Sequence, residues 1–517
     1  MIAQDSSLRG VAVRVASGDL AGTRSTDGEI AIFKGVPYAR PPVGALRWRP
    51  PQPPEPWSGT RPADAFGPRC IQQDRPSNAI SYFGLEKESE DCLYLNIWTA
   101  TIERSARLPV MVWFHGGAFS MGSGALPYFD GEALARRGVV LVTVNYRLGG
   151  LGFLAHPELT RESATGSSGN WGLLDQIAAL RWVRDNIASF GGDPNCVTIF
   201  GQSAGSSTGN YMMASAPARG LFHRVIGQSG GAVEAPGRPG GGSLMPLATA
   251  ENVGLKVAQS FGRKSIAELR ELPARDIQLA WPKDADCRPW PSIDGLVLSE
   301  SPYDAFADGR QYDVPLLTGA NAHEGSARPP AKNAQDWKAV LRRDYGDDAE
   351  ALFQMYGGGD DVDTMSRRSS GHVTFNAMNW TWARQQVATG KSKVFFYHFG
   401  RIPPLPPDCT FFENEASRLG AFHTAEIPYV FDTLDKRPWP WREIDRALAR
   451  MLSSYWVNFA THGDPNGTGV PLWPTFDPDG PTVLLVENAI TAGVLPERKE
   501  LDLWNVCLQH LRERRGR

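Results

Sequence analysis

The sequence lacks the features that mark nucleic-acid binding, membrane insertion or metal binding. Its 517 residues carry a formal net charge of -3, which provides neither the basic footprint of a nucleic-acid-binding protein nor an acidic tail. The longest apolar runs, at 108–114 and 138–144, are far shorter than the roughly 20 residues that a membrane span requires. CxxC, HExxH and dinucleotide-type glycine motifs do not occur, so we expect no metal and no organic cofactor. Small molecules are therefore the expected partners.

Cysteine is scarce as well, because six residues in the whole chain cannot staple a protein of this length. The fold must instead rest on a large hydrophobic core, which a composition of 42% hydrophobic and 21% charged residues allows. Cys70 and Cys92 bracket a polar, loop-like segment, and on spacing alone they are either a disulfide or two free thiols. The first residues, MIAQDSSLRG, lack the apolar stretch of a signal peptide. This fits a cytosolic protein or a mature form whose leader has been removed.

From about residue 108 the chain alternates short apolar segments with amphipathic ones. LPVMVWF at 108–114 and CVTIF at 196–200 are typical of buried strands. Between them, 170–190 carries apolar residues three and four positions apart, with Asn170 placed to cap a helix and Gly191 to end it. This alternation predicts an α/β protein with a mostly parallel central sheet and helices on both faces.

The second half of the chain continues the pattern, with strand segments that begin near Val314 and Lys393. The stretch 235–243 is a Gly/Pro-rich loop, and the residues up to about Arg275 look helical and more polar. We interpret this part as a helical insertion packed over the sheet, not as a separate domain. Since no repeat or long linker is present, we expect a single domain over 1–517.

The pentapeptide GQSAG at 201–205 has the form of a nucleophile turn. Serine catalysis of this type needs a hydroxyl on a sharp strand-to-helix turn with glycines two residues to either side. The chain contains a second match, GQSGG at 227–231, so the context decides. Ser203 follows the strand segment CVTIF and precedes small residues that can start a helix, whereas Ser229 runs into glycine and proline. We therefore predict Ser203 as the nucleophile.

A glycine-rich loop follows the strand segment LPVMVWF and reads HGGAF from His115. A Gly-Gly pair after a strand is most often a simple turn. In a serine hydrolase, backbone N–H groups of such a loop and of the residue after the nucleophile bind the developing oxyanion. The loop and the serine turn occur in the chain order that this arrangement requires, so we interpret the loop as one side of an oxyanion hole.

Taken together, these segments resemble the type-B carboxylesterase family, which includes bacterial p-nitrobenzyl esterases, cholinesterases and some fungal lipases. The motifs that carry the resemblance span nearly the whole chain: FKGVPYARPPVGALRW from Phe33, EDCLYLNIW from Glu90, HGGAF from His115, GNWGLLDQIAALRWVRDNIASFGGDP from Gly169, GQSAG from Gly201 and GDPN from Gly463. The resemblance implies an α/β-hydrolase fold and the hydrolysis of carboxylic esters through an acyl-enzyme intermediate.

The resemblance also assigns partners to Ser203. TGANAHEG looks like the acid motif and makes Glu324 the acid, and GAFHTAEIPYVF looks like the base motif and makes His423 the base. Their order along the chain is that of an α/β-hydrolase. From the residues alone, neither stands out among 56 acidic residues and nine histidines. By the same resemblance the oxyanion donors are the amides of Gly117, Ala118 and Ala204.

The family likeness further implies that Cys70 and Cys92 pair as a loop-closing disulfide, which favours the periplasm or secretion over the cytoplasm. The segment between them contains no tryptophan. Cholinesterases carry a choline-binding tryptophan in this loop for cation–π contact, so we do not expect cholinesterase activity. Cys196 is interpreted as a buried strand thiol. The state of the other cysteines stays open: Cys287, Cys409 and Cys507.

Two departures from the family bear on the substrate. Where relatives usually have glutamate before the nucleophile, this chain has Gln202, which removes a negative charge beside the reacting centre. In the segment that lines the acyl pocket in relatives, Arg288 stands where large apolar residues are common. A bidentate pair between Arg288 and a carboxylate on the acyl side would favour esters of di- or polycarboxylic acids, the type found in some mycotoxins. The alternative is that Arg288 points to solvent or pairs with Asp286.

Two rival functions belong to other classes. A lipase would act at an oil–water interface, and an adhesion or binding protein can keep the fold after losing its catalytic residues. The presence of all three triad residues favours an enzyme. The expected partner is a dissolved small-molecule ester, and the expected assembly is a monomer or a small homo-oligomer.

Overall fold

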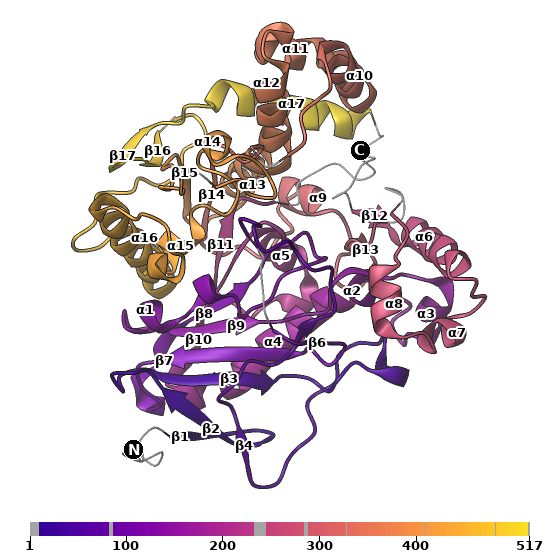
Figure 1. Ribbon diagram of the computed structural model, residues 1–517, viewed down its shortest axis with the longest axis vertical. Coiled ribbons are helices and arrows are strands. Elements are labelled where there is room, and N and C mark those ends of the chain that lie inside the picture. The colour runs from indigo at the N-terminus through magenta and orange to yellow at the C-terminus, as the bar shows by residue number, and fades with distance from the viewer. Residues whose placement is uncertain are drawn as a thin grey trace.

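The computed structural model describes residues 10–81, 86–231, 244–283, 288–326, 328–407, 409–480 and 482–514. Within these ranges thirteen strands form one sheet, in the order β1-β2-β3-β7-β9-β8-β10-β11-β14-β15-β16-β17, with β4 paired to β2. Neighbouring strands are parallel from β9 to β16, and antiparallel pairs complete both ends. Figure 1 shows the helices packed around this sheet. The predicted α/β architecture is confirmed.

The strands of the sheet are β1 Val11–Val15, β2 Gly18–Arg24, β3 Ala31–Pro37, β4 Thr60–Pro62, β7 Tyr94–Thr99, β8 Leu108–Phe114, β9 Val140–Val144, β10 Gly192–Gln202, β11 Arg224–Gln228, β14 Leu316–Asn321, β15 Val394–Phe399, β16 Thr482–Val486 and β17 Ile490–Val494. Two small pairs lie apart from it: β5 Arg69–Cys70 with β6 Glu88–Ser89, and β12 Met245–Pro246 with β13 Ser292–Ile293.

The helices are α1 Glu132–Ala135, α2 Gly149–Phe153, α3 Pro157–Glu162, α4 Trp171–Asn186, α5 Ala204–Ala214, α6 Leu247–Ser260, α7 Ile266–Arg270, α8 Ala274–Leu279, α9 Pro302–Ala307, α10 Ala334–Tyr345, α11 Ala349–Met355, α12 Val362–Gly371, α13 Ala377–Thr389, α14 Ala416–Leu419, α15 Ile427–Val430, α16 Glu443–His462 and α17 Arg498–Glu513.

Side chains of β8 alternate between the two faces of the sheet, and each face has its own hydrophobic core. Val110, Val112 and Phe114 belong to one cluster of buried side chains, whereas Met111 and Trp113 belong to another. All five are fully buried, as expected for a central strand of a sheet that is covered on both faces. The apolar runs of the sequence are therefore the central strands.

Helix α4 confirms the helix predicted for its segment. The chain leaves it through a short 3-10 turn that ends at Gly191, whose positive φ of 76° favours glycine. Asn170 is the N-cap residue of α4, as predicted, but its side chain makes no capping hydrogen bond. Instead it donates to the carbonyl oxygen of Ser292 at 2.8 Å and accepts the amide N–H of Ser292 at 3.0 Å. A tertiary contact has replaced the local one.

Helices α6, α7 and α8 form the predicted insertion and lie together on one flank of the molecule, beside α3 (Figure 1). Ile266 and Ile277 of the insertion share a small apolar core with Leu159 and Trp171. The insertion therefore packs onto α3 and α4 through apolar contacts. The Gly/Pro-rich stretch at 235–243 lies outside the described residues.

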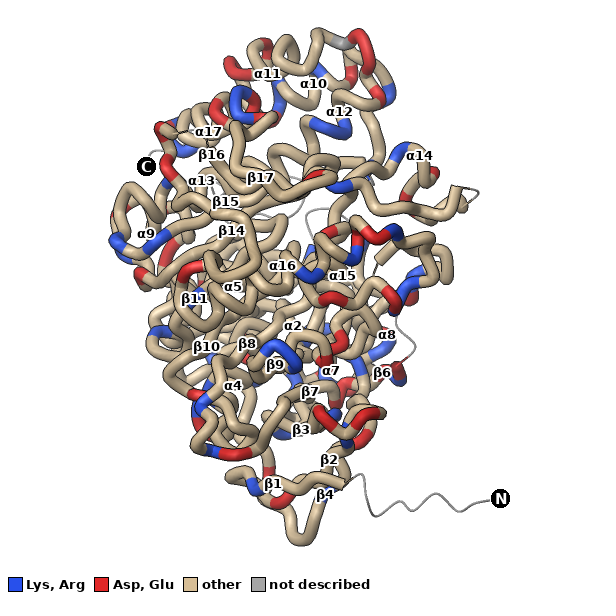
Figure 2. Tube along the Cα trace, turned by 90° about the vertical axis from the view of Figure 1, so that its left-hand side faces the viewer, with Lys and Arg blue, Asp and Glu red and all other residues tan. Residues whose placement is uncertain are grey.

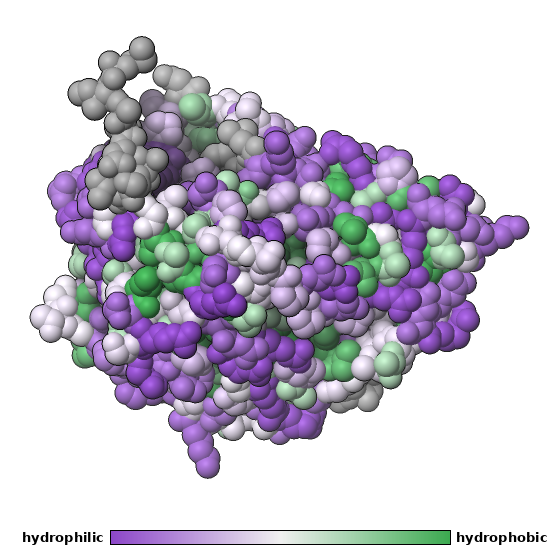
Figure 3. Space-filling view, turned by 90° about the horizontal axis from the view of Figure 1, so that it is seen from below, coloured by the Kyte–Doolittle hydropathy of each residue, from purple (hydrophilic) through white to green (hydrophobic). Residues whose placement is uncertain are grey.

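Charged residues of both signs are mixed over the surface. Figure 2 shows Lys and Arg interspersed with Asp and Glu along the helices and loops, in agreement with the small net charge of -3. On the face seen in Figure 3, hydrophobic residues form small patches separated by hydrophilic ones. No helix in the described part of the chain is long and apolar enough to cross a membrane.

The disulfide expected between Cys70 and Cys92 is not found, because both residues are free, buried thiols in this structure. A hydrogen bond with Cys70, together with burial, raises the pKa of Cys92 well above its usual value. The loop between them is closed by other contacts. Strand β5 pairs with β6, and Arg69 forms an ion pair with Glu88 at 3.1 Å. The argument for an oxidising compartment therefore loses its support.

The other cysteines that the structure describes are free as well. Cys196 lies on β10 as predicted, but its side chain is only partly buried. Cys409 is exposed and Cys507 is buried. Cys287 lies outside the described residues.

Candidate active site

Ser203 stands at the turn between β10 and α5, the strand–turn–helix context that the sequence predicted. Its backbone has φ 58° and ψ -122°, a strained conformation of the kind that presents a nucleophile above a sheet. The flanking glycines are required for space. A Cβ on Gly205 would lie 1.8 Å from the carbonyl oxygen of Phe114, and one on Gly201 would lie 2.5 Å from the carbonyl carbon of Gly205. Any side chain at either position would force the turn away from β8.

The second serine turn, around Ser229, packs against the turn that carries Ser203. Ser229 is fully buried, and its amide N–H donates to the carbonyl oxygen of Gly319 at 2.9 Å. A Cβ on Gly230 would lie 2.3 Å from the carbonyl oxygen of Ser203, so the two turns are in direct contact. Ser203, by contrast, is partly exposed. Of the two serines, only Ser203 can meet a substrate in this conformation.

The loop predicted as one side of an oxyanion hole follows β8 and has an unusual backbone. Gly117, Ala118 and Phe119 have positive φ values of 107°, 52° and 55°. Such conformations cost energy in non-glycine residues and cluster at functional sites. Among the described residues, no acceptor is found for the amide N–H groups of Gly117, Ala118 and Ala204. Three backbone donors are thus available for another acceptor.

His115 anchors the start of this loop. Its ring stacks on Tyr146 with a centroid distance of 4.5 Å, and the Tyr146 hydroxyl donates to the His115 carbonyl oxygen at 2.8 Å. Burial lowers the pKa of His115 to about 4, so the ring is neutral near neutral pH. In this neutral form the ring keeps one N–H, and Nδ1 lies within hydrogen-bond distance of the Gly116 carbonyl oxygen, at 2.8 Å. These contacts hold the loop in place.

Glu324 and His423 are joined by a short hydrogen bond. Oε2 of Glu324 accepts the Nδ1–H of His423 at 2.5 Å, and Oε1 accepts the amide N–H of Asn321 at 2.8 Å. Glu324 follows β14 and is buried. The loops that carry the two residues are bridged by a parallel pairing of His323 with Phe422. The structure therefore brings together the acid and base that the family resemblance assigned from separate motifs.

An aromatic ring that the sequence analysis missed packs against His423. Phe375 stacks on the imidazole with a centroid distance of 4.1 Å and an interplanar angle of 25°. On Phe375, in turn, lies the guanidinium carbon of Arg328, 5.5 Å from the ring centre. Phe375 belongs to a π-helical turn, His372–Asn376, between α12 and α13. Such turns often occur at functional sites, but no sequence pattern marked this one.

Gln202 is fully buried, and its side chain lies against His423. The Gln202 amide nitrogen is 3.1 Å from Nε2 and 3.3 Å from Nδ1 of the imidazole. Because Nδ1 donates to Glu324, the lone pair resides on Nε2. The Gln202 amide nitrogen is nearly equidistant from both ring nitrogens, so it lies against the ring and not in line with that lone pair. In the described part of the structure, the hydroxyl of Ser203 makes no hydrogen bond. Gln202 is therefore a close neighbour of the imidazole nitrogen that could serve Ser203.

A second carboxyl group, Glu426, is buried behind the Glu324–His423 pair. It accepts the side-chain N–H groups of Gln228 at 3.0 Å and of Asn321 at 2.7 Å. Burial, reinforced by the charge of Glu324, raises the pKa of Glu426 to about 7. Below that pH, its proton keeps a second negative charge away from Glu324. Glu426 lies inside the motif that identified His423, so the sequence contained the residue without indicating its environment.

Comparison with known proteins identifies the family. The carboxylesterase family model matches residues 9–504. A fumonisin B1 esterase of Sphingopyxis macrogoltabida is 40% identical over 470 residues, which cover 88% of this chain and 83% of that protein. Para-nitrobenzyl esterase of Bacillus subtilis (strain 168) is 34% identical over 502 residues, which cover 93% and 96%. The chain belongs to the carboxylesterase family.

Solved structures agree with this assignment. A PNB esterase structure superposes on this carboxylesterase with a TM-score of 0.80 and 31% sequence identity, covering 95% of this chain and 99% of that one. The chain therefore has the α/β-hydrolase fold and is a carboxylic ester hydrolase, as the sequence predicted. Within the described ranges, no group of three or more His, Cys, Asp or Glu residues could hold a metal ion.

Arg288 of this carboxylesterase lies at the edge of a small depression that Trp281 and Trp290 also line. Its guanidinium carbon is 5.0 Å from the centre of the Trp290 ring. Trp290 in turn meets Phe119 of the oxyanion loop edge-on, at a centroid distance of 5.1 Å. Arg288 has no ion pair with any other residue that the structure describes, and its alternative partner Asp286 lies outside those residues. One indole ring thus separates this cation from the oxyanion loop.

Proposed function

We propose that Ser203, His423 and Glu324 are the catalytic triad of this carboxylesterase and that catalysis proceeds through an acyl-enzyme. The observation that supports this most strongly is the 2.5 Å hydrogen bond from His423 to Glu324. It fixes the imidazole tautomer, leaves the Nε2 lone pair to take a proton from Ser203, and stabilises the imidazolium that results.

A hydrogen bond between Ser203 and His423 must form when substrate binds. In the free enzyme, the Gln202 amide nitrogen lies 3.1 Å from Nε2 of His423, and the Ser203 hydroxyl makes no hydrogen bond within the described ranges. We expect Nε2 to accept the Ser203 hydroxyl when an ester is bound, because catalytic hydrogen bonds are often loose in the free enzyme and tighten around the substrate.

The reaction then follows in two halves. His423 takes the hydroxyl proton while Oγ of Ser203 attacks the ester carbonyl, and the amides of Gly117, Ala118 and Ala204 stabilise the oxyanion. The proton passes from His423 to the departing alcohol, which leaves the acyl group on Ser203. Water, activated by His423, attacks this acyl ester and releases the carboxylic acid, and the proton returns to Oγ.

A phosphonofluoridate tests the triad, because it reacts with an activated serine. Peptide mapping should find the label on Ser203, and activity should fall in proportion to labelling. The Ser203→Ala variant should take up no label. His423→Ala keeps the hydroxyl without its base, so its labelling should be slow. Label on Ser229, or fast labelling of His423→Ala, would contradict the assignment.

We further propose that the preferred substrates are esters of di- or polycarboxylic acids, the type found in some mycotoxins. The guanidinium of Arg288, which has no ion pair among the described residues and lies near the loop that follows β8, supports this, since it can pair with a carboxylate of the acyl group. Gln202 adds no negative charge to repel such a group. A relative that shares 40% identity is named a fumonisin B1 esterase.

A matched pair of esters tests the substrate class. Monobenzyl glutarate carries a free carboxylate, and benzyl pentanoate has the same chain length without it. We expect kcat/KM to be at least about tenfold higher for the anionic ester, and the preference to shrink as salt screens the charge pair. Equal values for the two esters at low salt would rule out the preference.

A further inference from the structure

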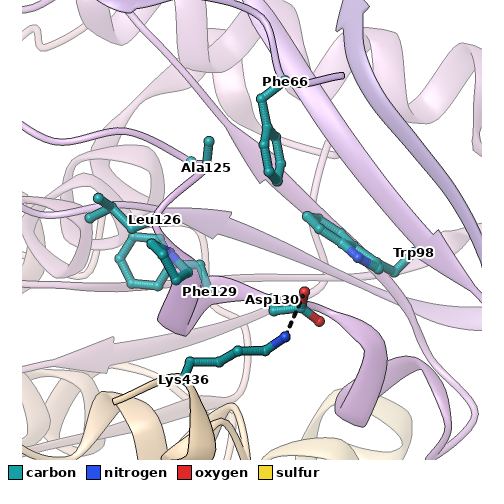
Figure 4. A pocket seen from close by; sticks show the side chains of 9 residues that line it. Phe66, Trp98, Ala125, Leu126, Phe129, Asp130 and Lys436 are labelled. Carbon is teal, nitrogen blue, oxygen red and sulfur yellow. Dashed lines mark ion pairs between the residues drawn. The ribbon is translucent and has the colours of Figure 1, made fainter. Parts of the chain in front are cut away.

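A cavity of about 220 Å³ lies between the end of β7, the loop that precedes α1, and Lys436 (Figure 4). Its walls are mostly apolar and include the rings of Phe66, Trp98 and Phe129 and the side chain of Leu126. None of the residues that line it belongs to the candidate active site. It is therefore a separate cavity in need of its own explanation.

Trp98 contributes a hydrogen-bond donor without a partner in the described part of the structure. Its side chain is only 1% exposed, and its Nε1–H has no acceptor in the described part of the structure. The ring is held in place, because a Cβ on Gly131 would lie 2.6 Å from Cδ2 of the indole. A buried N–H group without a partner costs roughly 1–3 kcal/mol. A ligand that brings an acceptor to Trp98 would recover that cost.

The polar end of the cavity also offers an acceptor. Oδ2 of Asp130 forms an ion pair with Nζ of Lys436 at 3.6 Å, and Oδ1 accepts the amide N–H of Glu132 at 3.0 Å. Both groups line the cavity, and Figure 4 shows the ion pair at the same end as the indole nitrogen of Trp98. Each carboxylate oxygen has a further lone pair, so Asp130 can accept another hydrogen bond.

A donor and an acceptor at one end of an apolar cavity match a hydroxyl group, which accepts one hydrogen bond and donates another. The ion pair of Asp130 with Lys436 is neutral overall, so this end of the cavity favours a neutral ligand. An apolar cavity of about 150 Å³ holds a benzene ring, so this one has room for a ring with a short side chain. We propose that this cavity binds a small alcohol with an apolar body, its hydroxyl accepting from Trp98 and donating to Asp130. Alcohols are also products of ester hydrolysis, so the enzyme itself generates ligands of this class.

The test follows the indole N–H signals by NMR in protein with isotope-labelled tryptophan. Trp98→Phe identifies the Trp98 signal. Trp382 is the matched control, because its indole N–H is also buried without a partner among the described residues but does not line the cavity. Benzyl alcohol should move the Trp98 signal saturably and leave the Trp382 signal in place. Toluene, which has the same ring without the hydroxyl, should bind at least about fivefold more weakly.

A cavity-filling variant locates the binding. Ala125→Leu places a larger side chain in the wall and should abolish the benzyl alcohol shift of Trp98. If that variant does not fold, Asp130→Ala removes the acceptor without adding bulk and should reduce the preference for benzyl alcohol over toluene. A Trp98 signal that does not move would overturn the proposal. So would equal binding of toluene, or an unchanged shift in Ala125→Leu.

Discussion

Among single residues, Gln202 shows how one amide in place of a carboxylate changes a site. Its amide nitrogen lies 3.1 Å from Nε2 of His423 and adds no charge there, whereas a carboxylate in its place could only accept hydrogen bonds and would attract an imidazolium. The family resemblance identified the substitution, but only the structure shows that the side chain faces His423. Gln202, which precedes Ser203 in the sequence, is thus also a neighbour of His423 in space.

Gln202→Glu should shift the pH dependence of hydrolysis. A carboxylate beside the imidazole favours its protonated form. Because the imidazole must be unprotonated to act, activity should decline earlier in the variant than in the parent enzyme as the pH is lowered. The acidic limb of the kcat/KM profile for a neutral ester measures this, and an unchanged limb would mean that the two side chains do not interact.

Replacement of each serine separately distinguishes the two serine turns. Ser203→Ala should lower kcat by about a million-fold, the usual cost of losing a triad nucleophile. Ser229→Ala removes a buried hydroxyl and should leave most of the activity. Steady-state kinetics with a p-nitrophenyl ester measures both. Comparable activity of Ser203→Ala and the parent would refute the nucleophile assignment.

Arg288→Ala should weaken selection of the acyl group. We expect kcat/KM for monobenzyl glutarate to fall by at least about tenfold, equivalent to 1.4 kcal/mol, while benzyl pentanoate is nearly unaffected. Arg288→Lys keeps the charge but loses the bidentate geometry, so its kcat/KM for monobenzyl glutarate should lie between those of the parent and Arg288→Ala. If both esters decline equally, or neither changes, Arg288 does not select the substrate.

At the scale of elements, α12, which a π-helical turn joins to α13, packs against the loop that carries Glu324. A Cβ on Gly325 would lie 1.8 Å from the carbonyl oxygen of Arg367, and one on Gly371 would lie 2.4 Å from the amide nitrogen of Gly325. The π-helical turn between these helices then carries Phe375 onto His423. One helical segment therefore positions both the acid loop and the base ring.

Phe375→Ala should lower kcat with little change in KM, because the ring orients His423 and is not proposed to touch the substrate. Loss of a stacked ring is worth roughly 0.5–1.5 kcal/mol, which corresponds to a decline of about tenfold at most. Phe375→Tyr keeps the ring and should restore kcat. The kinetic constants of the three enzymes measure this, and a rise in KM alone would assign Phe375 to substrate binding instead.

These elements also show where sequence reasoning succeeds and fails. The central strands and α4 were predictable because an apolar run or a helical period is written in consecutive residues. The bond of Asn170 to Ser292 and the contact of Phe375 with His423 join distant segments. No local pattern encodes them. Glu324 and His423 were singled out only because the family resemblance supplied the missing spatial information.

For the molecule as a whole, two sets of buried groups matter: the thiols of Cys70 and Cys92, and the carboxyl group of Glu426. Cys70 and Cys92 are free, so the loop between them rests on strand pairing and ion pairs. The spacing alone had left both states open, and the family pattern selected the wrong one. Glu426 affects stability, because its burial near Glu324 makes proton binding differ between the folded and unfolded chain.

Glu426→Gln should flatten the pH dependence of stability. The pKa of Glu426 is about 7 in the fold and 4.5 as the reference value. Between these values the unfolded chain has released its proton and the folded chain retains it, so the free energy of unfolding falls as pH rises. The loss amounts to about 3 kcal/mol. Between pH 4.5 and above pH 7, denaturant unfolding should therefore show a smaller decrease in the free energy of unfolding for the variant than for the parent. Parallel curves would contradict this.

The bridge between His323 and Phe422 has a consequence for engineering. The chain leaves the sheet after Glu324, forms α10 to α13, re-enters the sheet as β15, and reaches His423 by way of α14. The segment from α10 to α13 therefore starts and ends at neighbouring strands, because β14 pairs with β15. Added length at its tip costs little entropy and does not pull Glu324 from His423. In Figure 1 helices α10 and α11 lie at the far end of the molecule. The turn at Gly357–Gly359 is therefore a natural graft point for a reporter tag or a surface anchor.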